Sequence, residues 1–261
     1  MKLVIKIGGT LLDQAESRAR LACEIADAAR QNPIVVVHGG GKQMTRYLSE
    51  RAIETRFVAG LRVTTPEILD AVLKIFAGTV NTELVAAFRG AGANPVGLTG
   101  VDAGLVDAEL LCPDLGHVGR PVHSDGRLLN LLVSAGYLPI IACVAGDRSG
   151  NIYNVNGDQM AAACASAFGA EKLVFLTDVE GVRDAGGAIL ASLSASQARD
   201  LIQSGVANGG MQAKLEAALG GLEEMRDQPL EIRICAGSSP KMIDKIVSGQ
   251  PLGTRVINNN D

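Results

Sequence analysis

The chain has no tryptophan, and only three tyrosines, five phenylalanines and three histidines occur among its 261 residues. Surfaces that bind single-stranded nucleic acid rely on aromatic side chains that stack on bases. The 24 basic residues are outnumbered by 28 acidic residues and form no long cluster. Binding to a phosphate backbone requires clustered Lys and Arg. The composition therefore argues against nucleic acid as a partner.

Cysteine is also scarce. The five cysteines are odd in number, lie far apart and include no C-x-x-C pair, so they predict free thiols rather than a disulfide framework. The histidines lack zinc-ligand spacing, and we expect no metal held by side chains alone. No apolar run approaches about 18 residues, and no signal-peptide pattern is present, so we expect no membrane partner. These absences favour a cytoplasmic protein with reduced thiols.

The chain is rich in a repeated pattern of short apolar run, glycine and helix-like segment. The runs Leu3–Ile7, Ile34–Val37 and Lys172–Leu176 are typical of buried strands. Strands that alternate with helices predict an α/β fold with a mainly parallel sheet covered on both faces. Ligands of such sheets bind beyond the carboxyl ends of the strands. We divide the chain into an N-terminal lobe at residues 1–170 and a C-terminal lobe at 171–261, joined by one continuous sheet.

Local signals predict several element boundaries. Asp13 with Glu16, and Ser194 with Gln197, have the spacing of a capping box at a helix start. The polar stretch Ala145–Asn156 either separates two lobes or forms a hairpin.

Lys6-Ile7-Gly8-Gly9 is the first candidate for chemistry. Lys6 stands inside an apolar run that is expected to be buried. An unpaired buried ammonium is costly, so Lys6 should meet an anion. Gly8 and Gly9 would let backbone N–H groups approach that anion closely. The alternative is a lysine on an edge strand, with its ammonium in water.

His38-Gly39-Gly40-Gly41-Lys42 follows the second strand. A strand that ends in glycines and opens into a helix forms a cradle for anions, because free N–H groups and the helix dipole point outward. The motif is not a P-loop, since Gln43 stands where Ser or Thr would be, and it is not G-x-G-x-x-G. The alternative is a tight turn without a ligand.

Three further motifs contain charged or amide side chains. Arg62, between apolar neighbours, could bind a substrate carboxylate or form a surface salt bridge. Asn154 lies on the same side of an extended segment as a second asparagine, and Asp158 follows at a helix start. Asp158 could hold catalytic cations or merely cap the helix. Lys214, after a second glycine pair, could be a catalytic cation or a solvated lysine.

The order of the motifs is more specific than any one of them. Along the chain they are K-x-G-G, H-G-G-G, G-L-R-V-T, N-x-N-G-D, T-D-V-x-G-V and G-G-M-x-x-K. This series resembles the amino acid kinase family, over nearly the whole chain. The resemblance implies an open αβα sandwich of the carbamate kinase type, with the amino acid in the N-terminal lobe and ATP in the C-terminal lobe. It also implies transfer of phosphate from ATP, with Mg²⁺, to the side-chain carboxylate of N-acetyl-L-glutamate in arginine biosynthesis.

The resemblance assigns residues to this reaction. Lys6 and Lys214 would stabilise the phosphoryl group in transfer, and Asp158 would organise the two lysines. The amino acid would be bound by Gly40, Gly41, Arg62 and Asn154. The nucleotide and its phosphates would be bound by Gly8, Gly9, Thr177, Asp178, Gly181, Val182, Arg183, Val206, Asn208, Gly210 and Met211. Mg²⁺ would be held by ATP and water rather than by protein ligands.

The chain departs from the family pattern at two positions and leaves alternatives open. Ala59 and Gly209 stand where the family often has Asn and Asp. The first strand begins at once, which leaves no room for the extra N-terminal helix of arginine-inhibited members, so we expect a homodimer that arginine does not inhibit. A related kinase acting on carrier-linked aminoadipate, or a non-catalytic sensor of amino acids or nucleotides, would share much of this sequence. A dinucleotide-binding oxidoreductase is disfavoured because the first loop lacks G-x-G-x-x-G.

Overall fold

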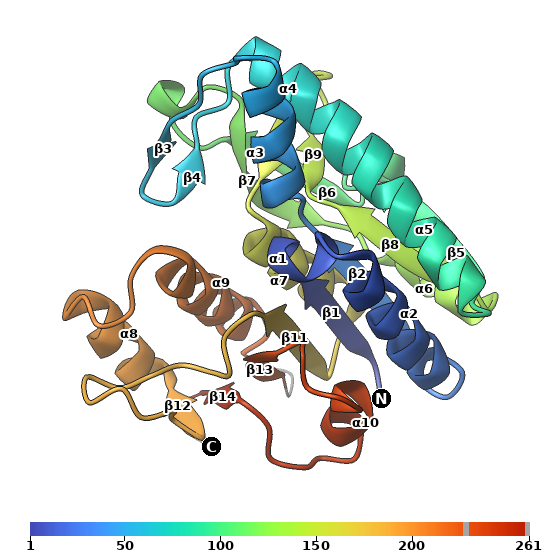
Figure 1. Ribbon diagram of the computed structural model, residues 1–261, viewed down its shortest axis with the longest axis vertical. Coiled ribbons are helices and arrows are strands. Elements are labelled where there is room, and N and C mark those ends of the chain that lie inside the picture. Colours follow the sequence, from blue (N-terminus) through green and yellow to red (C-terminus); the bar gives the residue numbers. More distant parts are fainter. Residues whose placement is uncertain (227–229, 259–261) are drawn as a thin grey trace.

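The computed structural model describes residues 1–226 and 230–258, and an eight-stranded sheet forms its centre (Figure 1). In spatial order the strands are β12 (Ser192–Ser194), β14 (Thr254–Ile257), β13 (Glu231–Ala236), β11 (Lys172–Thr177), β1 (Leu3–Ile7), β2 (Ile34–His38), β8 (Leu138–Ala142) and β5 (Pro95–Thr99). Every neighbouring pair is parallel except β13 and β14. The predicted α/β fold with a mainly parallel sheet is confirmed.

Helices cover both faces of this sheet. On one face α2 (Ala15–Ala29) packs between α10 (Met242–Val247) and α5 (Asn81–Gly90). On the other face α7 (Gly157–Phe168) packs between α9 (Gly209–Glu224) and α6 (Arg127–Ser134). Because both faces are covered, every residue of β1, β2, β8 and β11 is buried.

The sheet crosses the expected lobe boundary without a break, since β1 pairs with β11 in parallel. The division at residue 170 stays a prediction. The helix α8 (Ala195–Gln203) packs against α9 and β14 at the C-terminal end of the chain. In Figure 1 these elements occupy the lower left, and α2 and α5 occupy the right.

One long helical run passes through three conformations. It consists of α4 (Pro66–Val72), a π-helical segment η1 (Leu73–Val80) and α5. By length and composition this run could cross a membrane, contrary to our expectation from the sequence. A core helix passes the same test, and Val72, Phe76 and Phe88 of this run pack into the main hydrophobic core.

A smaller sheet closes on itself beside the central one. Its strands are β6 (Val106–Leu110), β7 (Val118–Ser124), β9 (Val144–Gly146) and β10 (Ile152–Val155). The strands β9 and β10 pair as an antiparallel hairpin, so the second of our two readings of the stretch 145–156 is confirmed. Two 3₁₀ turns, η2 (Asp102–Gly104) and η3 (Pro113–Leu115), flank β6.

The remaining elements lie at the carboxyl ends of the central strands. They are α1 (Gly9–Leu12), α3 (Gly41–Glu50), β3 (Phe57–Val58) and β4 (Leu61–Arg62). The capping box predicted at Ser194 is confirmed. The one predicted at Asp13 is wrong: α2 begins at Ala15 without a side-chain cap, and the Asp13 carboxylate instead binds Arg46 at 3.0 Å.

Candidate functional site

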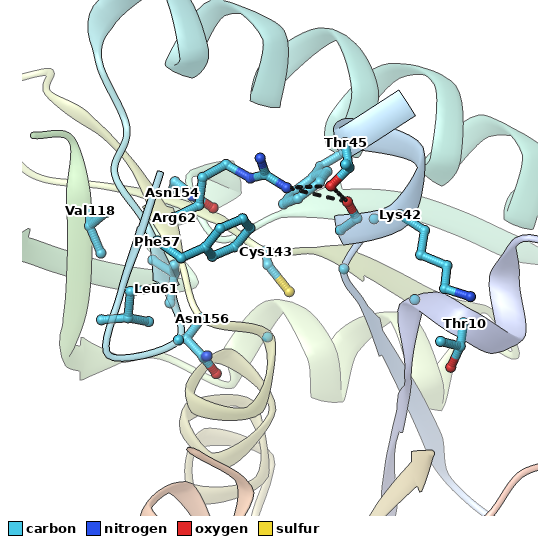
Figure 2. Close-up of a pocket in the computed structure, with 18 of the residues that line it drawn as sticks. Thr10, Lys42, Thr45, Phe57, Leu61, Arg62, Val118, Cys143, Asn154 and Asn156 are labelled. Atoms are coloured by element: carbon cyan, nitrogen blue, oxygen red, sulfur yellow. Dashed lines mark hydrogen bonds between the residues drawn. The ribbon is translucent and has the colours of Figure 1, made fainter. Parts of the chain in front are cut away.

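A cavity of about 790 Å³ lies at the carboxyl ends of β1 and β2 (Figure 2). Six residues predicted from the sequence line it: Lys6, Gly9, Gly40, Gly41, Arg62 and Asn154. Residues that sequence reasoning did not single out also line it, among them Thr10, Thr45, Phe57 and Cys143. Parallel strands end at one edge of a sheet, which is why segments far apart in the sequence meet here.

A buried carboxylate holds two lysines at this edge. The Asp158 Oδ1 atom lies 2.8 Å from the Lys6 Nζ atom, and the Asp158 Oδ2 atom lies 3.4 Å from the Lys214 Nζ atom. Lys6 lies on β1 between β11 and β2, so the edge-strand alternative is wrong. Lys6 comes from the first strand and Lys214 from α9, and the ion pairs bring these distant segments together.

Asp158 can bind both lysines because another side chain caps its helix. The Asn156 side chain accepts hydrogen bonds from the backbone N–H groups of Asp158 at 2.8 Å and Gln159 at 3.3 Å. The alternative that Asp158 only caps the helix is therefore wrong. Its carboxylate keeps both oxygen atoms for the lysines, while the helix N-terminus adds favourable potential for its negative charge.

The charges of this trio remain in place at neutral pH. Burial opposes ionisation of Asp158, but the charges of Lys6 and Lys214 outweigh burial and hold the pKa of Asp158 below its ordinary value. Burial likewise favours a neutral amine at Lys6, but the charge and hydrogen bond of Asp158 outweigh it and raise the pKa of Lys6. Two ammonium groups and one carboxylate leave one net positive charge, which suits an anionic ligand.

Two glycine loops approach one another beside the lysines. A Cβ atom on Gly9 would lie 3.3 Å from the backbone nitrogen of Gly41, and one on Gly40 would lie 2.8 Å from the Phe76 ring. The neighbouring Gly8 N–H donates to the Leu176 carbonyl at 2.8 Å, so that N–H group is committed to the sheet. Among the backbone groups of the first loop, those of Gly9 are the ones that line the cavity.

Arg62 is buried without an acidic partner. Its guanidinium donates to the hydroxyl groups of Thr45 at 2.7 Å and Thr55 at 2.8 Å, and it stacks 4.5 Å from the centre of the Phe57 ring. Figure 2 shows Arg62 extended toward Thr45 with Phe57 beside it. Burial lowers the pKa of Arg62. No carboxylate of the described residues pairs with this guanidinium, so the salt-bridge alternative is wrong and the charge is left for a ligand.

The backbone of the loop before Arg62 suits the Asn that the family often has at position 59 better than the Ala of this chain. Ala59 and Gly60 connect β3 to β4, and both have left-handed backbone conformations, with φ of 47° and 79°. Asn and Gly tolerate this conformation best, whereas Ala is strained in it.

Nearby, the Asn154 side chain donates to the Thr64 hydroxyl at 3.0 Å, which fixes its amide at the wall of the cavity.

The residues expected to contact the nucleotide lie outside this cavity. They surround the end of β11 and the start of α9 and comprise Thr177, Asp178, Gly181, Val182, Arg183, Val206, Asn208, Gly210 and Met211. The Thr254 hydroxyl accepts a hydrogen bond from the Val182 N–H at 2.8 Å and would lie 2.7 Å from a Cβ on Gly181, so this turn is packed tightly against β14. Val206 lines a separate, mostly apolar cavity of about 400 Å³.

Together, the fold and the site define an α/β protein with a cationic centre at the carboxyl edge of its sheet, suited to carboxylate and phosphate groups. The chain belongs to the amino acid kinase family, whose model matches residues 1–233. It is 56% identical to acetylglutamate kinase of Solibacter usitatus, over 98% of this chain and 99% of that protein. It is 43% identical to acetylglutamate kinase of Acidobacterium capsulatum, over 88% and 92% of the two chains.

Solved structures share the fold at lower identity. N-acetylglutamate synthase from Neisseria gonorrhoeae matches with a TM-score of 0.84 at 24% identity, over 98% of this chain and 59% of that longer one. Carbamate kinase from Giardia lamblia matches with a TM-score of 0.72 at 17% identity, over 99% and 98% of the two chains. At these identities the matches support the carbamate kinase type of fold and nothing further.

The buried ring of His38 predicts a distinct pH dependence of stability. Burial lowers the pKa of His38 from 6.5 to about 4, despite the hydrogen bond to Gly39. As the pH falls from 6.5 toward 4, the His38 ring therefore becomes protonated in the unfolded chain but stays neutral in the folded protein. We expect this group to stabilise the fold fully above pH 6.5 and to lose up to about 3 kcal/mol of that contribution near pH 4.

Denaturant unfolding of wild type and His38→Asn between pH 7 and pH 4 measures the effect. The variant should show the smaller loss of unfolding free energy, because it has no ring to titrate. Asp158, whose pKa is lowered below 3.8, acts at lower pH in both proteins and cancels in the comparison. Superimposable pH profiles would show that the ring does not titrate in the proposed way.

Proposed function

We propose that the protein transfers the γ-phosphoryl group of ATP to the side-chain carboxylate of N-acetyl-L-glutamate, the second step of arginine biosynthesis. The observation that carries this proposal is the convergence of Lys6 and Lys214 on the Asp158 carboxylate. Support also comes from the full-length similarity to proteins named acetylglutamate kinase.

The amino acid fits the cavity by charge. N-acetyl-L-glutamate carries two carboxylates and one amide. We assign its α-carboxylate to the unpaired guanidinium of Arg62, which can bind a carboxylate through two parallel hydrogen bonds. The Asn154 amide would bind a further polar group of the same molecule. The side-chain carboxylate would then lie toward Gly40 and Gly41, close to Lys6.

The reaction needs charge stabilisation more than proton transfer. A side-chain carboxylate, with a reference pKa of about 4.3, is already ionised at neutral pH and needs no general base. Its oxygen attacks the γ-phosphorus, the bond from that phosphorus to the bridging oxygen of ADP breaks, and the products are an acyl phosphate and ADP. Lys6 and Lys214 would stabilise the negative charge spread over the oxygens of the phosphoryl group. Asp158 would hold both amines in position before substrate arrives.

ATP would lie along the residues at the end of β11 and the start of α9. Thr177, Asp178, Gly181, Val182 and Arg183 would follow one side of the nucleotide, and Val206, Asn208, Gly210 and Met211 the other. The backbone N–H groups at the start of α9 favour phosphate, and Lys214 lies one turn further along. Gly9 would donate its N–H group to a phosphate oxygen, and we assign Gly8 the role of shaping that loop.

Mg²⁺ fits this site only as a partner of the nucleotide. The described residues do not bring three metal-ligating side chains together, and both oxygens of Asp158 are engaged by lysines. Mg²⁺ would therefore be held by the phosphates of ATP and by water, where it neutralises phosphate charge.

We further propose that the protein is a homodimer and that it acts in the cytoplasm.

A hydroxamate assay with ATP, Mg²⁺ and N-acetyl-L-glutamate tests the reaction, since hydroxylamine traps an acyl phosphate. Wild type should form the hydroxamate, and Lys6→Met and Lys214→Met should each lower kcat about 100- to 1,000-fold. Lys74→Met removes an exposed lysine that does not line the cavity and serves as the control. If carrier-linked aminoadipate were phosphorylated in preference to free N-acetyl-L-glutamate, the related kinase would be the correct assignment. A chain that binds the amino acid without turnover would be a sensor.

Replacement of Arg62 tests the orientation of the amino acid. Arg62→Lys keeps the charge but loses the forked geometry, so we expect KM for N-acetyl-L-glutamate to rise about 10- to 100-fold while kcat changes little. Arg89→Lys, on the exposed face of α5, is the matched control. Steady-state kinetics at saturating ATP separate the two parameters. A fall in kcat with an unchanged KM would place Arg62 at the reacting group instead.

A further inference from the structure

A series of buried hydrogen bonds lies beneath the glycine loop that follows β2. His38 has no exposed surface, and its Nδ1 atom lies 2.8 Å from the Gly39 carbonyl oxygen. Its Nε2 atom lies 2.9 Å from the Asn81 Nδ2 atom, and that amide nitrogen also donates to the Ile140 carbonyl at 2.9 Å. A carbonyl can only accept, so Nδ1 carries the proton and Nε2 accepts from Asn81. A single neutral tautomer therefore satisfies every contact.

These hydrogen bonds fix the direction of the peptide group between Gly39 and Gly40. The described residues contain no cis peptide bond, so the carbonyl of Gly39 and the N–H of Gly40 point in opposite directions. The carbonyl faces the buried ring of His38, and the N–H therefore faces away from it, toward the cavity that Gly39, Gly40 and Gly41 line. The Gly40 N–H has no acceptor among the described residues, although the Gly40 carbonyl accepts the first helical hydrogen bond of α3 from Met44.

Side-chain packing restrains Gly40, through Phe76 and Val80, but not the glycines on either side of it. Apart from chain neighbours and the backbone of α3, no atom lies within 4 Å of the positions that Cβ atoms on Gly39 and Gly41 would take. Glycine has the greatest backbone freedom of any residue. Donors that stabilise a transition state are effective only when they are already oriented. A buried anchor at Gly39 would supply that orientation.

The partner of His38 comes from the junction of the π-helical segment and α5. Asn81 follows directly after η1, and Phe76 and Val80 of η1 pack against Gly40. A Cβ on Gly97 would lie 2.1 Å from the Asn81 Oδ1 atom, so the glycine leaves the space that Asn81 occupies. π-Helical segments are uncommon and often mark functional sites. Here the π-helical segment η1 packs against Gly40, and Asn81, directly after it, contacts the ring of His38.

We propose that His38, held by Asn81, is a positioning residue that turns the Gly40 N–H group toward the point where the side-chain carboxylate of the amino acid meets the phosphate. The inference rests on the proposed function and assigns to His38 a role in phosphoryl transfer without contact with substrate. His38 acts through the backbone of Gly40 alone, so its loss should weaken stabilisation of the transition state more than binding of the amino acid, for which Arg62 and Asn154 remain in place.

Two substitutions at His38 separate the anchor from the bulk of the ring. The amide nitrogen of asparagine can take the place of Nδ1 and still donate to the Gly39 carbonyl, whereas glutamine reaches toward Asn81 and loses that bond. We expect His38→Gln to lower kcat by about 10-fold or more and to change KM for N-acetyl-L-glutamate by less than about threefold. His38→Asn should keep kcat within about threefold of wild type. Phe88→Leu, a core change on α5 away from the loop, controls for lost stability.

Equal kcat losses in the two His38 variants, or losses that Phe88→Leu reproduces at the same melting temperature, would overturn the inference. A measurement on the unaltered protein covers the case in which a variant does not fold. Long-range ¹H–¹⁵N spectra of the His38 ring at neutral pH should show a protonated Nδ1 and an unprotonated Nε2, and the opposite tautomer would also overturn it. An inactive wild type would refute the proposed function instead, and the tautomer would still test the anchor.

Discussion

The structure depends on one buried carboxylate that is shared by two amines. Asp158 would be costly to bury alone, and so would Lys6, yet each stabilises the charged form of the other. The third member, Lys214, comes from the opposite half of the sequence, so the pairing also joins the segments that would handle amino acid and nucleotide. The site is charged and assembled before any ligand enters, which is the condition for electrostatic catalysis.

The rest of the fold places the groups that would bind ligands around the Asp158 carboxylate. The parallel order of β11, β1 and β2 places two glycine loops at one edge of the sheet, beside the start of α7. Asn156 caps α7 and so frees the carboxylate two residues later. Behind the loops, the π-helical segment supplies apolar packing, and Asn81 at the start of α5 supplies a polar anchor. The barrel formed by β6, β7, β9 and β10 carries Asn154 on the far wall of the cavity.

Sequence reasoning succeeded where a residue conflicted with its surroundings. A lysine within an apolar strand required an anion, and glycines after buried strands marked the ligand edge, so Lys6 and the loop at Gly40 were predictable. Arg62 was open to two interpretations until its burial and lack of an acidic partner were known. The partners Thr45, Thr55 and Asn81 could not be predicted, because each meets its target through tertiary packing and none stands in a distinctive motif. The strands β6 and β7 were missed for a different reason: few of their residues are buried, so neither forms an apolar run in the sequence.

A structure with ADP, a planar mimic of the phosphoryl group and N-acetyl-L-glutamate would show whether Lys6 and Lys214 both reach the group in transfer. We expect the Nζ atoms of Lys6 and Lys214 both to lie within hydrogen-bond distance of the mimic, about 2.7 to 3.2 Å, while Asp158 still contacts both amines. A mimic bound elsewhere, or one contacted by neither lysine in a fully closed complex, would contradict it.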